Sequence, residues 1–373
     1  MIHLILFLLI FLTLLYLYKI ASFSLGLFKL KPGQNQEVKS VTVLVPARNE
    51  QNNIAACLES MVSQDYPTDK LEIIVIDDNS SDNTYKIVQS YCERYPFVHL
   101  FSSGICPPGI SPKKRALEIG IKSATGEIIF TTDADCMASP NWLQRTMRYF
   151  EADVGMVSGL VAFLPQSEKT LFQKIQSLEF IGLITAGIGS IGNDDPIIAN
   201  GANLAFRKSV FNEVHGYRGN SHIISGDDDL LLQKIDQETD WRIAAAPALD
   251  AIVYTKASSD FNSFLNQRIR WASKGFIYKK VSLVIFLVAV YLLYLLLFVS
   301  LPFAICFFVI FPYPVLALFA KFVVDFLLIL KGTAIVDRKD LRKYFIIAEL
   351  VQIPYILYVG FASIVKKFEW KGR

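Results

Sequence analysis

Apolar residues are concentrated at the two ends of this chain, and this uneven distribution limits the folds that are possible. The segment from Leu4 to Ile20 is almost wholly apolar and close to the ~20 residues that a helix needs to cross a bilayer. A second apolar block, from Val281 to Leu330, is long enough for two such helices. Only 19% of the residues are charged, whereas an ordinary soluble domain carries about 25%. The sequence therefore predicts membrane helices on either side of one domain of ordinary composition, between Val41 and Asn266.

The charges that flank the first apolar segment predict its orientation. Lys19, Lys29 and Lys31 occur at or after its end, whereas Met1 to His3 carries no Lys or Arg. A cleaved signal peptide would instead begin with basic residues and end at a small-residue cleavage site. Because the cytoplasmic flanks of membrane helices are enriched in Lys and Arg, we expect an uncleaved anchor whose following residues are cytoplasmic.

The last apolar stretch, from Tyr344 to Val365, is less regular because Glu349 and Pro354 interrupt it. A basic loop at 331–343 precedes the stretch, and a basic tail at 366–373 follows it. A full crossing would place these two basic segments on opposite sides of the membrane, against the usual preference. The sequence therefore favours a re-entrant or interfacial hairpin over a fourth crossing.

The middle of the chain alternates short apolar strands with helical segments. Strands are expected at 40–45, 71–76 and 128–132, and helices at 52–63 and 84–95. This order predicts a parallel sheet with right-handed crossovers, in which ligands bind at the carboxyl ends of the strands. Glu50 and Asp78 would lie on that edge. No glycine-rich phosphate loop follows a strand, which disfavours the dinucleotide-binding and P-loop classes, and a net charge of +3 is too small to indicate nucleic acid.

Asp133-Ala134-Asp135 directly follows the third expected strand. Two carboxylates at this spacing can share one hard cation, and Mg²⁺ and Mn²⁺ prefer oxygen ligands and commonly bridge carboxylates to substrate phosphates. The alternative is a capping turn before a helix that begins near Asn141. The triplet alone does not decide between these two interpretations.

Three later segments also carry polar residues with a chemical use. Asp227-Asp228-Asp229 could supply a general base, although an acidic helix N-terminus would explain one of the three. Asn200-Gly201 follows a strand expected at 196–199 and suits either the close approach of a ligand to the backbone or an ordinary turn. Gln267, Arg270 and Trp271 share one helical face, which could bind a diphosphate and a sugar or lie on the lipid surface.

Taken in order, the motifs resemble those of the family 2 glycosyltransferases. They read VPARNE (45–50), VIDDNSSDNT (75–84), PKKRALEIGI (112–121), TGEIIFTTDADC (125–136) and QRIRW (267–271). Members of that family are inverting enzymes of the GT-A fold, an α/β fold with a Rossmann-like, mostly parallel sheet. The resemblance implies a cytoplasmic GT-A domain joined to transmembrane helices in the cell membrane, a UDP-sugar donor and a membrane-associated acceptor, either a lipid or a glycan.

The resemblance also implies a role for each motif residue. Asp78 contacts the uracil, Asp133 the ribose, and Asp135 together with Asp133 the Mg²⁺ or Mn²⁺ ion. Lys113 lies near the diphosphate, and Asp228 is the general base, with Asp227 as the alternative. The other residues expected at the nucleotide or donor sugar are Pro46, Ala47, Arg48, Glu50, Asp77, Asn200 and Gly201, and those expected at the acceptor or diphosphate are Gln267, Arg268, Arg270 and Trp271.

These expectations give a domain plan and leave other functions open. The plan is an anchor at 1–22, a catalytic domain at 38–265, an interfacial helix at 266–280, transmembrane or re-entrant helices at 281–365 and a basic tail at 366–373. A transferase that adds one sugar to a lipid is favoured over a processive polysaccharide synthase, because only three or four spans are available to build a tunnel. An inactive membrane scaffold is the alternative from another class. A transporter is disfavoured because the ionisable residues in the apolar segments, Lys321, Asp325 and Glu349, form no evident pathway.

Overall fold

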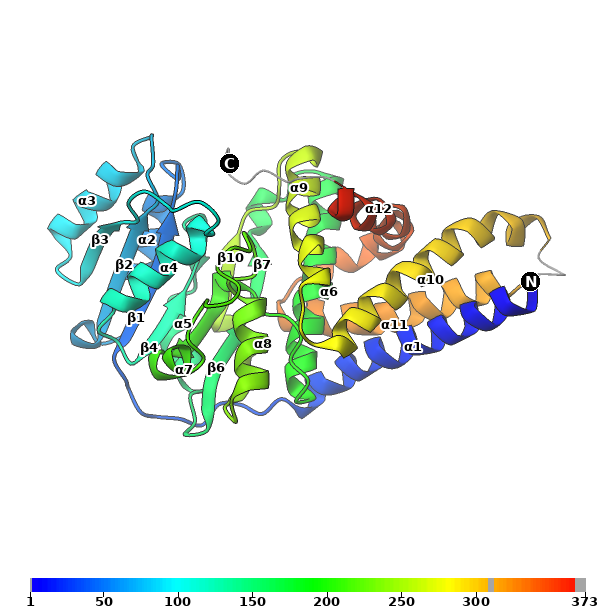
Figure 1. Ribbon diagram of the computed structural model, residues 1–373, viewed down its shortest axis with the longest axis horizontal. Helices are drawn as coiled ribbons and strands as arrows, with labels where there is room; N and C mark the ends of the chain where they lie inside the picture. The colour runs from blue at the N-terminus through cyan, green and yellow to red at the C-terminus, as the bar shows by residue number, and fades with distance from the viewer. Residues whose placement is uncertain (1, 308–311, 366–373) are drawn as a thin grey trace. The chain divides into compact units, whose positions relative to one another are not determined.

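The computed structural model describes residues 2–307 and 312–365, and the chain forms two compact units (Figure 1). The sheet unit comprises Lys29–Ser167 and Ser190–Lys256. The helical unit comprises Met1–Phe28, Glu168–Gly189 and Ala257–Arg373. The expected basic tail at 366–373 lies outside the described residues. The helical unit therefore draws on three separate parts of the sequence, one of which interrupts the sheet unit.

The core of the sheet unit is a seven-stranded, mostly parallel sheet, as the sequence predicts. In spatial order its strands are β3 (Val98–Ser102), β2 (Leu71–Asp77), β1 (Val41–Ala47), β4 (Ile128–Thr131), β8 (Leu204–Arg207), β6 (Val154–Gly159) and β9 (Arg242–Ala246). β1 is parallel to β2 and β4, whereas β8 is antiparallel to β4 and β6. All residues of β1 except Pro46 are buried, as expected for a strand that is covered on both faces. A second sheet consists of β5 (Met137–Ala138), β10 (Val253–Thr255) and β7 (Val161–Phe163).

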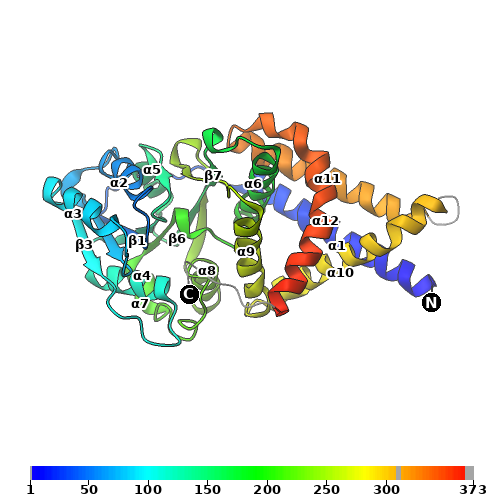
Figure 2. The same ribbon diagram turned by 90° about the horizontal axis from the view of Figure 1, so that it is seen from above.

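Helices cover both faces of the parallel part of the sheet. α2 (Ile54–Val62) and α3 (Thr84–Arg94) lie on one face and α4 (Pro112–Ser123) on the other (Figure 2). The strand order explains this division. The chain moves from β1 through β2 to β3 in one direction along the sheet and then returns past β1 to β4. Right-handed crossovers in opposite directions place their helices on opposite faces of the sheet. α4 approaches closely at Gly120, where an added Cβ would lie 2.8 Å from the Ile76 side chain and 3.0 Å from the Leu44 side chain. The other helices of the unit are α5 (Trp142–Met147), α7 (Lys208–Glu213) and α8 (Asp229–Glu238).

The strand expected at 196–199 is absent, and this part of the chain is an irregular loop. Its backbone groups are paired with side chains and not with a neighbouring strand. The Ala199 N–H donates to Asp229 Oδ1 at 3.1 Å, and the Ile197 N–H donates to Ser190 Oγ at 3.2 Å. The strand forms instead at β8, after a short 3-10 turn at Gly201–Asn203.

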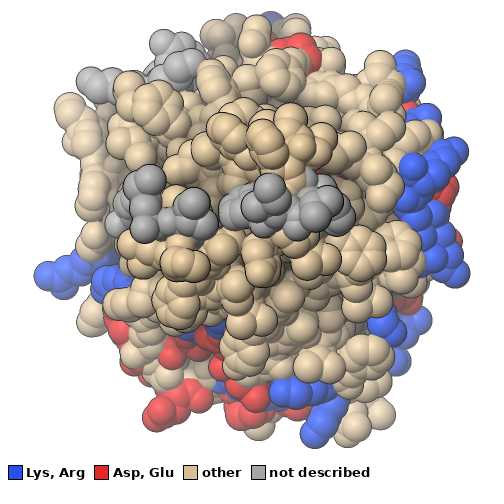
Figure 3. Space-filling view, turned by 90° about the vertical axis from the view of Figure 1, so that its right-hand side faces the viewer, with Lys and Arg blue, Asp and Glu red and all other residues tan. Residues whose placement is uncertain are grey.

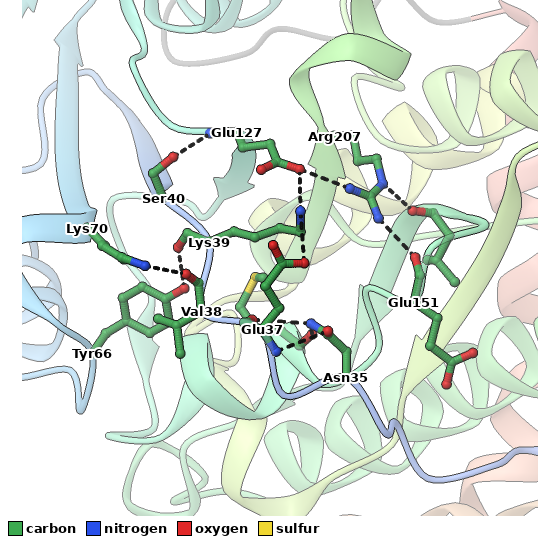
Figure 4. A network of polar contacts seen from close by, with 12 residues as sticks. Asn35, Glu37, Val38, Lys39, Ser40, Tyr66, Lys70, Glu127, Glu151 and Arg207 are labelled. Atoms are coloured by element: carbon green, nitrogen blue, oxygen red, sulfur yellow. Dashed lines mark hydrogen bonds and ion pairs between the residues drawn. The ribbon is translucent and has the colours of Figure 1, made fainter.

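Residues 30–40 form a linker between α1 and β1. A polar network holds this linker at the edge of the sheet where β1 and β4 begin (Figure 4). Lys39 Nζ donates to Glu127 Oε1 at 2.8 Å, and Arg207 Nη1 donates to the same oxygen at 3.1 Å. Lys70 Nζ donates to the Val38 carbonyl at 2.7 Å. The network lies at the opposite edge of the sheet from the predicted ligand site, so it fixes the linker without occupying that site.

The helical unit contains long apolar helices. By length and composition, five helices among the described residues could cross a membrane: α1 (Ile2–Lys29), α6 (Leu171–Gly192), α10 (Val281–Cys306), α11 (Tyr313–Ile335) and a last one over Lys339–Val365 that contains α12 (Phe345–Val365). α1, α10 and α11 run side by side (Figures 1 and 2). Large apolar side chains on them are exposed, among them Phe7, Phe298 and Phe319. Among the described residues, the centre of the face in Figure 3, which looks onto the ends of these helices, shows no Lys, Arg, Asp or Glu. An apolar surface of this extent indicates contact with a membrane.

Three features of these helices differ from the sequence-based expectation. α1 continues to Lys29, beyond the anchor expected at 1–22. α6 was assigned to the catalytic domain, but most of it belongs to the helical unit. α12 is one continuous helix, without the reversal that a hairpin requires, and it lies across the direction of α1, α10 and α11 (Figure 2). That orientation keeps the interfacial interpretation of this segment open.

Three ionisable residues of the apolar helices, Lys321, Asp325 and Glu349, meet in one buried cluster. Lys321 of α11 is 0% exposed, and its Nζ donates to Asp325 Oδ2 at 2.7 Å, to Gln352 Oε1 at 2.9 Å and to Glu349. Tyr16 of α1 donates its hydroxyl to Asp325 Oδ1 at 2.8 Å. The cluster therefore joins α1, α11 and α12 through interactions that satisfy one another.

Candidate active site

Two asparagines turn the chain where β1 and β2 end. Asn49 and Asn79 have φ values of 52° and 55°, in the left-handed region that asparagine tolerates better than most residues. The Asn49 side chain accepts a hydrogen bond from the Ser81 N–H at 2.8 Å, and the Asn49 N–H donates to Ser80 Oγ at 3.0 Å. The loops after β1 and β2 thus brace each other along the carboxyl edge of the sheet.

Asp78 lies at this edge, and its neighbours fix its carboxylate. It is 3% exposed and accepts a hydrogen bond from Ser103 Oγ at 2.8 Å, while its backbone carbonyl accepts one from Arg48 Nη1 at 2.9 Å. The adjacent Asp77 accepts from the Ser80 N–H at 3.2 Å through one oxygen, but its other, buried oxygen has no partner among the described residues. A buried acceptor without a donor costs free energy, so this edge suits a ligand that brings an N–H or O–H group.

Three further residues predicted at the donor lie at the end of β1 or in the loop that follows it. Pro46 and Ala47 are the last two residues of β1, and the Ala47 carbonyl accepts from the Asp78 N–H at 2.8 Å. Glu50 is buried; its N–H donates to Thr84 Oγ1 at 2.7 Å, and its carboxylate accepts from Asn53 Nδ2 at 2.7 Å. These contacts shape the loop beside Asp78.

Asp133 and Asp135 follow β4, the strand on the other side of β1. Ligand atoms of Asp133, Asp135 and Cys136 lie within 4.8 Å of one another, close enough to surround one ion. Burial raises the pKa of the Cys136 thiol well above its usual value, and the Asp135 and Asp133 carboxylates raise it further. The thiol therefore stays protonated near neutral pH, and the carboxylate oxygens are the ligands that a hard cation such as Mg²⁺ or Mn²⁺ would use. The residues present fit such an ion.

Lys113 of α4 connects the Asp133 side of the site to the acidic segment before α8. Its Nζ lies 2.8 Å from Asp133 Oδ1 and 2.9 Å from Asp227 Oδ2. Burial would lower the pKa of the Lys113 ammonium, but the two carboxylates outweigh burial and hold the pKa well above its usual value. Lys113 is therefore a fixed positive charge between two acidic segments that are 94 positions apart in the sequence, from 133 to 227.

Asp228 begins α8 and contacts the turn at Gly201. Asp228 Oδ2 accepts from the Gly201 N–H at 3.0 Å, and its Oδ1 accepts from the Asp229 N–H at 2.7 Å. An added Cβ at Gly201 would lie 3.1 Å from Asp227 Oδ2, so a side chain here would crowd the Asp227 carboxylate. The preceding residue, Asn200, holds the turn by accepting from the Ala202 N–H at 3.0 Å. The sheet unit thus brings Lys113, Asp133, Asp227, Asp228 and Gly201 together.

Comparison with known proteins agrees with this arrangement. Residues 42–214 match the family model described as glycosyl transferase family 2. The matched segment, called the glycosyl transferase domain, covers 173 of the 373 residues of the chain. The chain is 26% identical to the poly-beta-1,6-N-acetyl-D-glucosamine synthase of Staphylococcus epidermidis over 250 residues. This alignment covers 65% of this chain and 56% of that protein. The chain is 24% identical to the beta-monoglucosyldiacylglycerol synthase of Synechocystis over 244 residues, and this alignment covers 63% of this chain and 48% of that protein.

A solved structure resembles the chain beyond the glycosyl transferase domain. The mannosyltransferase PcManGT from Pyrobaculum calidifontis, in complex with GDP-Man and Mn²⁺, aligns with a TM-score of 0.62 over 97% of this chain and 99% of that chain. At 21% identity the likeness shows the fold alone, and it confirms the predicted GT-A architecture of the domain. The chain spans about half the length of the curated relatives named above.

The last motif lies outside the glycosyl transferase domain, on α9 (Phe261–Ala272) of the helical unit. Gln267, Arg270 and Trp271 lie on this helix, as predicted. Arg268 is buried and paired with Glu179 of α6 through two guanidinium nitrogens. The carboxylate cluster and this motif therefore belong to different compact units of the chain.

Sequence reasoning did not single out two residues that fix the glycosyl transferase site. Ser103 donates to the Asp78 carboxylate, and Thr131 Oγ1 donates to the Gly201 carbonyl at 2.8 Å. Both lie at the end of a strand, or next to one, on the carboxyl edge of the sheet. Position alone would have made them candidates, but their partners are 25 and 70 residues away in the sequence.

Proposed function

We propose that the protein is an inverting glycosyltransferase that moves a sugar from a UDP-sugar to a membrane-associated lipid acceptor. The observation that carries the proposal is the ion pairing of Lys113 with both Asp133 and Asp227. It gathers a candidate metal ligand, a cation for a diphosphate and a candidate base at the carboxyl edge of one sheet. Ligands bind at that edge in parallel α/β sheets.

In the proposed reaction, Asp135 and Asp133 would hold the Mg²⁺ or Mn²⁺ ion, which would supply positive charge to the leaving diphosphate. Lys113 adds a second positive charge on the same side. Asp228 accepts the proton of the acceptor hydroxyl as that oxygen attacks the anomeric carbon from the opposite face. The Gly201 and Asp229 N–H groups donate to Asp228 and hold its carboxylate in place for this step.

The nucleoside end of the donor would lie against Asp78. Its fixed, buried carboxylate can accept one hydrogen bond from the N–H of a base. Uracil is proposed by family resemblance, whereas PcManGT is described with GDP-Man. A titration with UDP and with GDP, each with Mn²⁺, decides between the two, and tighter binding of GDP would overturn the uracil assignment.

The acceptor is proposed to be a lipid, and the alternative is a growing polysaccharide. One named relative is a synthase of a glucosyl lipid and another is a polysaccharide synthase, so similarity alone supports both. Incubation of the purified protein with a donor and membrane lipid extract, followed by mass spectrometry, should show a lipid that has gained one sugar. A ladder of long polymers would instead identify a processive synthase.

The Lys residues at the ends of the apolar helices support a cytoplasmic glycosyl transferase domain. Lys29 ends α1, Lys280 precedes α10, and Lys331 lies near the end of α11, so all three occur at one end of these neighbouring helices. The described residues at the opposite ends, near His3 and Tyr313, include no Lys or Arg. Because cytoplasmic ends carry the excess of Lys and Arg, we place the Lys-bearing end in the cytoplasm.

The central test is sugar transfer by the purified protein with Mn²⁺ or Mg²⁺ and a panel of nucleotide sugars. Asp135→Asn should raise the metal concentration required for half-maximal activity, because one charged oxygen ligand is lost. An inactive scaffold would neither transfer sugar nor bind any nucleotide in calorimetry. If Asp135→Asn left the metal dependence of transfer unchanged, the proposed metal site would be wrong.

Replacing Lys113 by Met should strengthen the binding of Mn²⁺ alone and weaken the binding of the nucleotide sugar. Without nucleotide, the Lys113 ammonium competes with a cation for Asp133, so we expect roughly tenfold tighter Mn²⁺ binding, equivalent to about 1.4 kcal/mol. With nucleotide, the same substitution removes a cation from the diphosphate. Calorimetric titrations with and without UDP measure both effects. Lys122→Met, at the end of the same helix, is the control, and equal Mn²⁺ affinity in the two variants would contradict the prediction.

A further inference from the structure

Arg268 is a buried cation at the centre of the last motif. It is 3% exposed, and its charge is met by Glu179 of α6, which accepts from Nε at 3.1 Å and also from Nη2. Glu179 Oε1 accepts a further hydrogen bond from the Tyr355 hydroxyl of α12 at 3.2 Å. α9 is thus anchored to two other helices of the helical unit through one guanidinium group.

The same guanidinium contacts two of the three motif residues. Its Nη1 donates to Gln267 Oε1 at 2.7 Å, and its Cζ lies 4.2 Å from the centre of the Trp271 ring. Phe180 of α6 lies beside Trp271, and the two ring centres are 6.1 Å apart. Arg268 therefore contacts both the amide oxygen of Gln267 and the ring of Trp271.

Only arginine can make this set of contacts. Its planar guanidinium presents five N–H donors in a fixed plane, so two nitrogens can pair with a carboxylate while a third reaches Gln267 and the flat face lies against an indole. Lysine offers a single charged nitrogen without a flat surface. α9 also packs through Ile269 against Val359 and Ala362 of α12, so α9 has little freedom to compensate for the loss of Arg268.

We infer that Arg268, held by Glu179, is a positioning residue that orients Gln267 and Trp271 for the acceptor. This inference rests on the proposed function and on the family resemblance, which implies that the motif residues bind the acceptor or the diphosphate. It replaces the role that sequence resemblance suggests for Arg268 itself, because its three guanidinium nitrogens already pair inside the helical unit. Arg268 acts on the reaction only through its neighbours.

The test compares Arg268→Lys and the double variant R268Q/E179Q with wild type in the full-length protein. The double variant removes both charges together, so no lone buried carboxylate remains to unfold the protein. We expect the KM for the acceptor to rise roughly tenfold, equivalent to about 1.4 kcal/mol, while the affinity for UDP with Mn²⁺ stays at the wild-type value. Arg268→Lys should show the same pattern, since lysine keeps the positive charge but lacks the planar guanidinium group.

Trp271 fluorescence gives a reading that does not depend on activity. Subtracting the spectrum of Trp271→Phe isolates the Trp271 signal from those of the other tryptophans, and quenching by acrylamide should increase in R268Q/E179Q. The matched control is R338Q/E168Q, because Arg338 pairs with Glu168 in the same unit through two contacts of 2.7 Å and 2.6 Å, away from the motif. The control should leave Trp271 quenching and acceptor KM unchanged.

The outcomes separate the inference from the proposed function. Unchanged Trp271 quenching in a folded R268Q/E179Q protein would overturn the positioning role, whether or not the wild type transfers sugar. Equal effects of the two double variants would also overturn it, because they would indicate general loosening of the helical unit. Absence of transfer by the wild type together with the expected quenching change would reject the proposed function and leave the orientation of Trp271 by Arg268 standing.

Discussion

Replacing Asp228 by Asn should lower the rate of sugar transfer by about 10²–10⁴-fold, the contribution that a positioned general base typically makes. Asparagine has nearly the same shape and remains a good N-cap for α8, where Asp228 now accepts the Asp229 N–H. One of the two hydrogen bonds to the carboxylate can therefore persist. What the substitution removes is the ability to take a proton from the acceptor.

The measurement is kcat for transfer together with the affinity for UDP and Mn²⁺, which should stay close to the wild-type value. Asp240→Asn, an exposed carboxylate just beyond α8, is the control and should leave kcat unchanged. If Asp228→Asn retained more than about a tenth of the wild-type rate, the base would have to be sought at Asp227. Asp227→Asn would also disturb the ion pair with Lys113. We therefore expect a lower affinity for UDP in Asp227→Asn but not in Asp228→Asn.

Replacing Lys321 by Met should destabilise the helical unit by about 3–5 kcal/mol, the usual cost of removing one partner from a buried ion pair. Lys321 is 0% exposed and donates to Asp325, Glu349 and Gln352. Without its ammonium, two buried carboxylates face each other unpaired inside apolar helices. Such charges are especially costly where no water is available to solvate them.

Unfolding by denaturant in detergent measures this effect. Lys331→Met is the matched control on the same helix, since Lys331 is exposed and contacts only the Phe28 ring among the partners that the structure describes. K321M/D325N/E349Q should recover much of the lost stability, because it removes the unpaired charges together with the cation. A loss below about 1 kcal/mol in Lys321→Met, comparable to that of a surface pair, would contradict a closed buried cluster.

Much of the sheet unit is predictable because its signals are local. The strands at 41–47, 71–77 and 128–131 are short apolar runs that end in turn residues, and their order with the intervening helices requires a parallel sheet. The carboxyl edge then follows from topology, which is why Asp78 and Asp133 could be assigned to one site. The prediction of a strand at 196–199 was wrong because side chains distant in the sequence, including Asp229, accept hydrogen bonds from the backbone of this segment.

α6 was missed as a membrane candidate for a different physical reason. Its mean hydropathy is 1.3, well below the 2.9 of α10, and 61% of its most apolar window is buried inside the protein. A helix surrounded by other helices can carry polar side chains such as Glu179, because partners like Arg268 neutralise them. Its sequence therefore resembles that of a helix in a soluble core.

The sequence by itself determined the α/β class, the apolar helices and the residue types available for sugar transfer, because these depend on neighbours along the chain. Only the tertiary structure decided which of those residues meet. Lys113 joins Asp133 to Asp227, Lys321 joins Asp325 to Glu349, and Arg268 is taken up by Glu179. Each pairing requires a buried charge to lie next to a residue of opposite charge. The packing of elements that are far apart in the sequence determines which residues become neighbours.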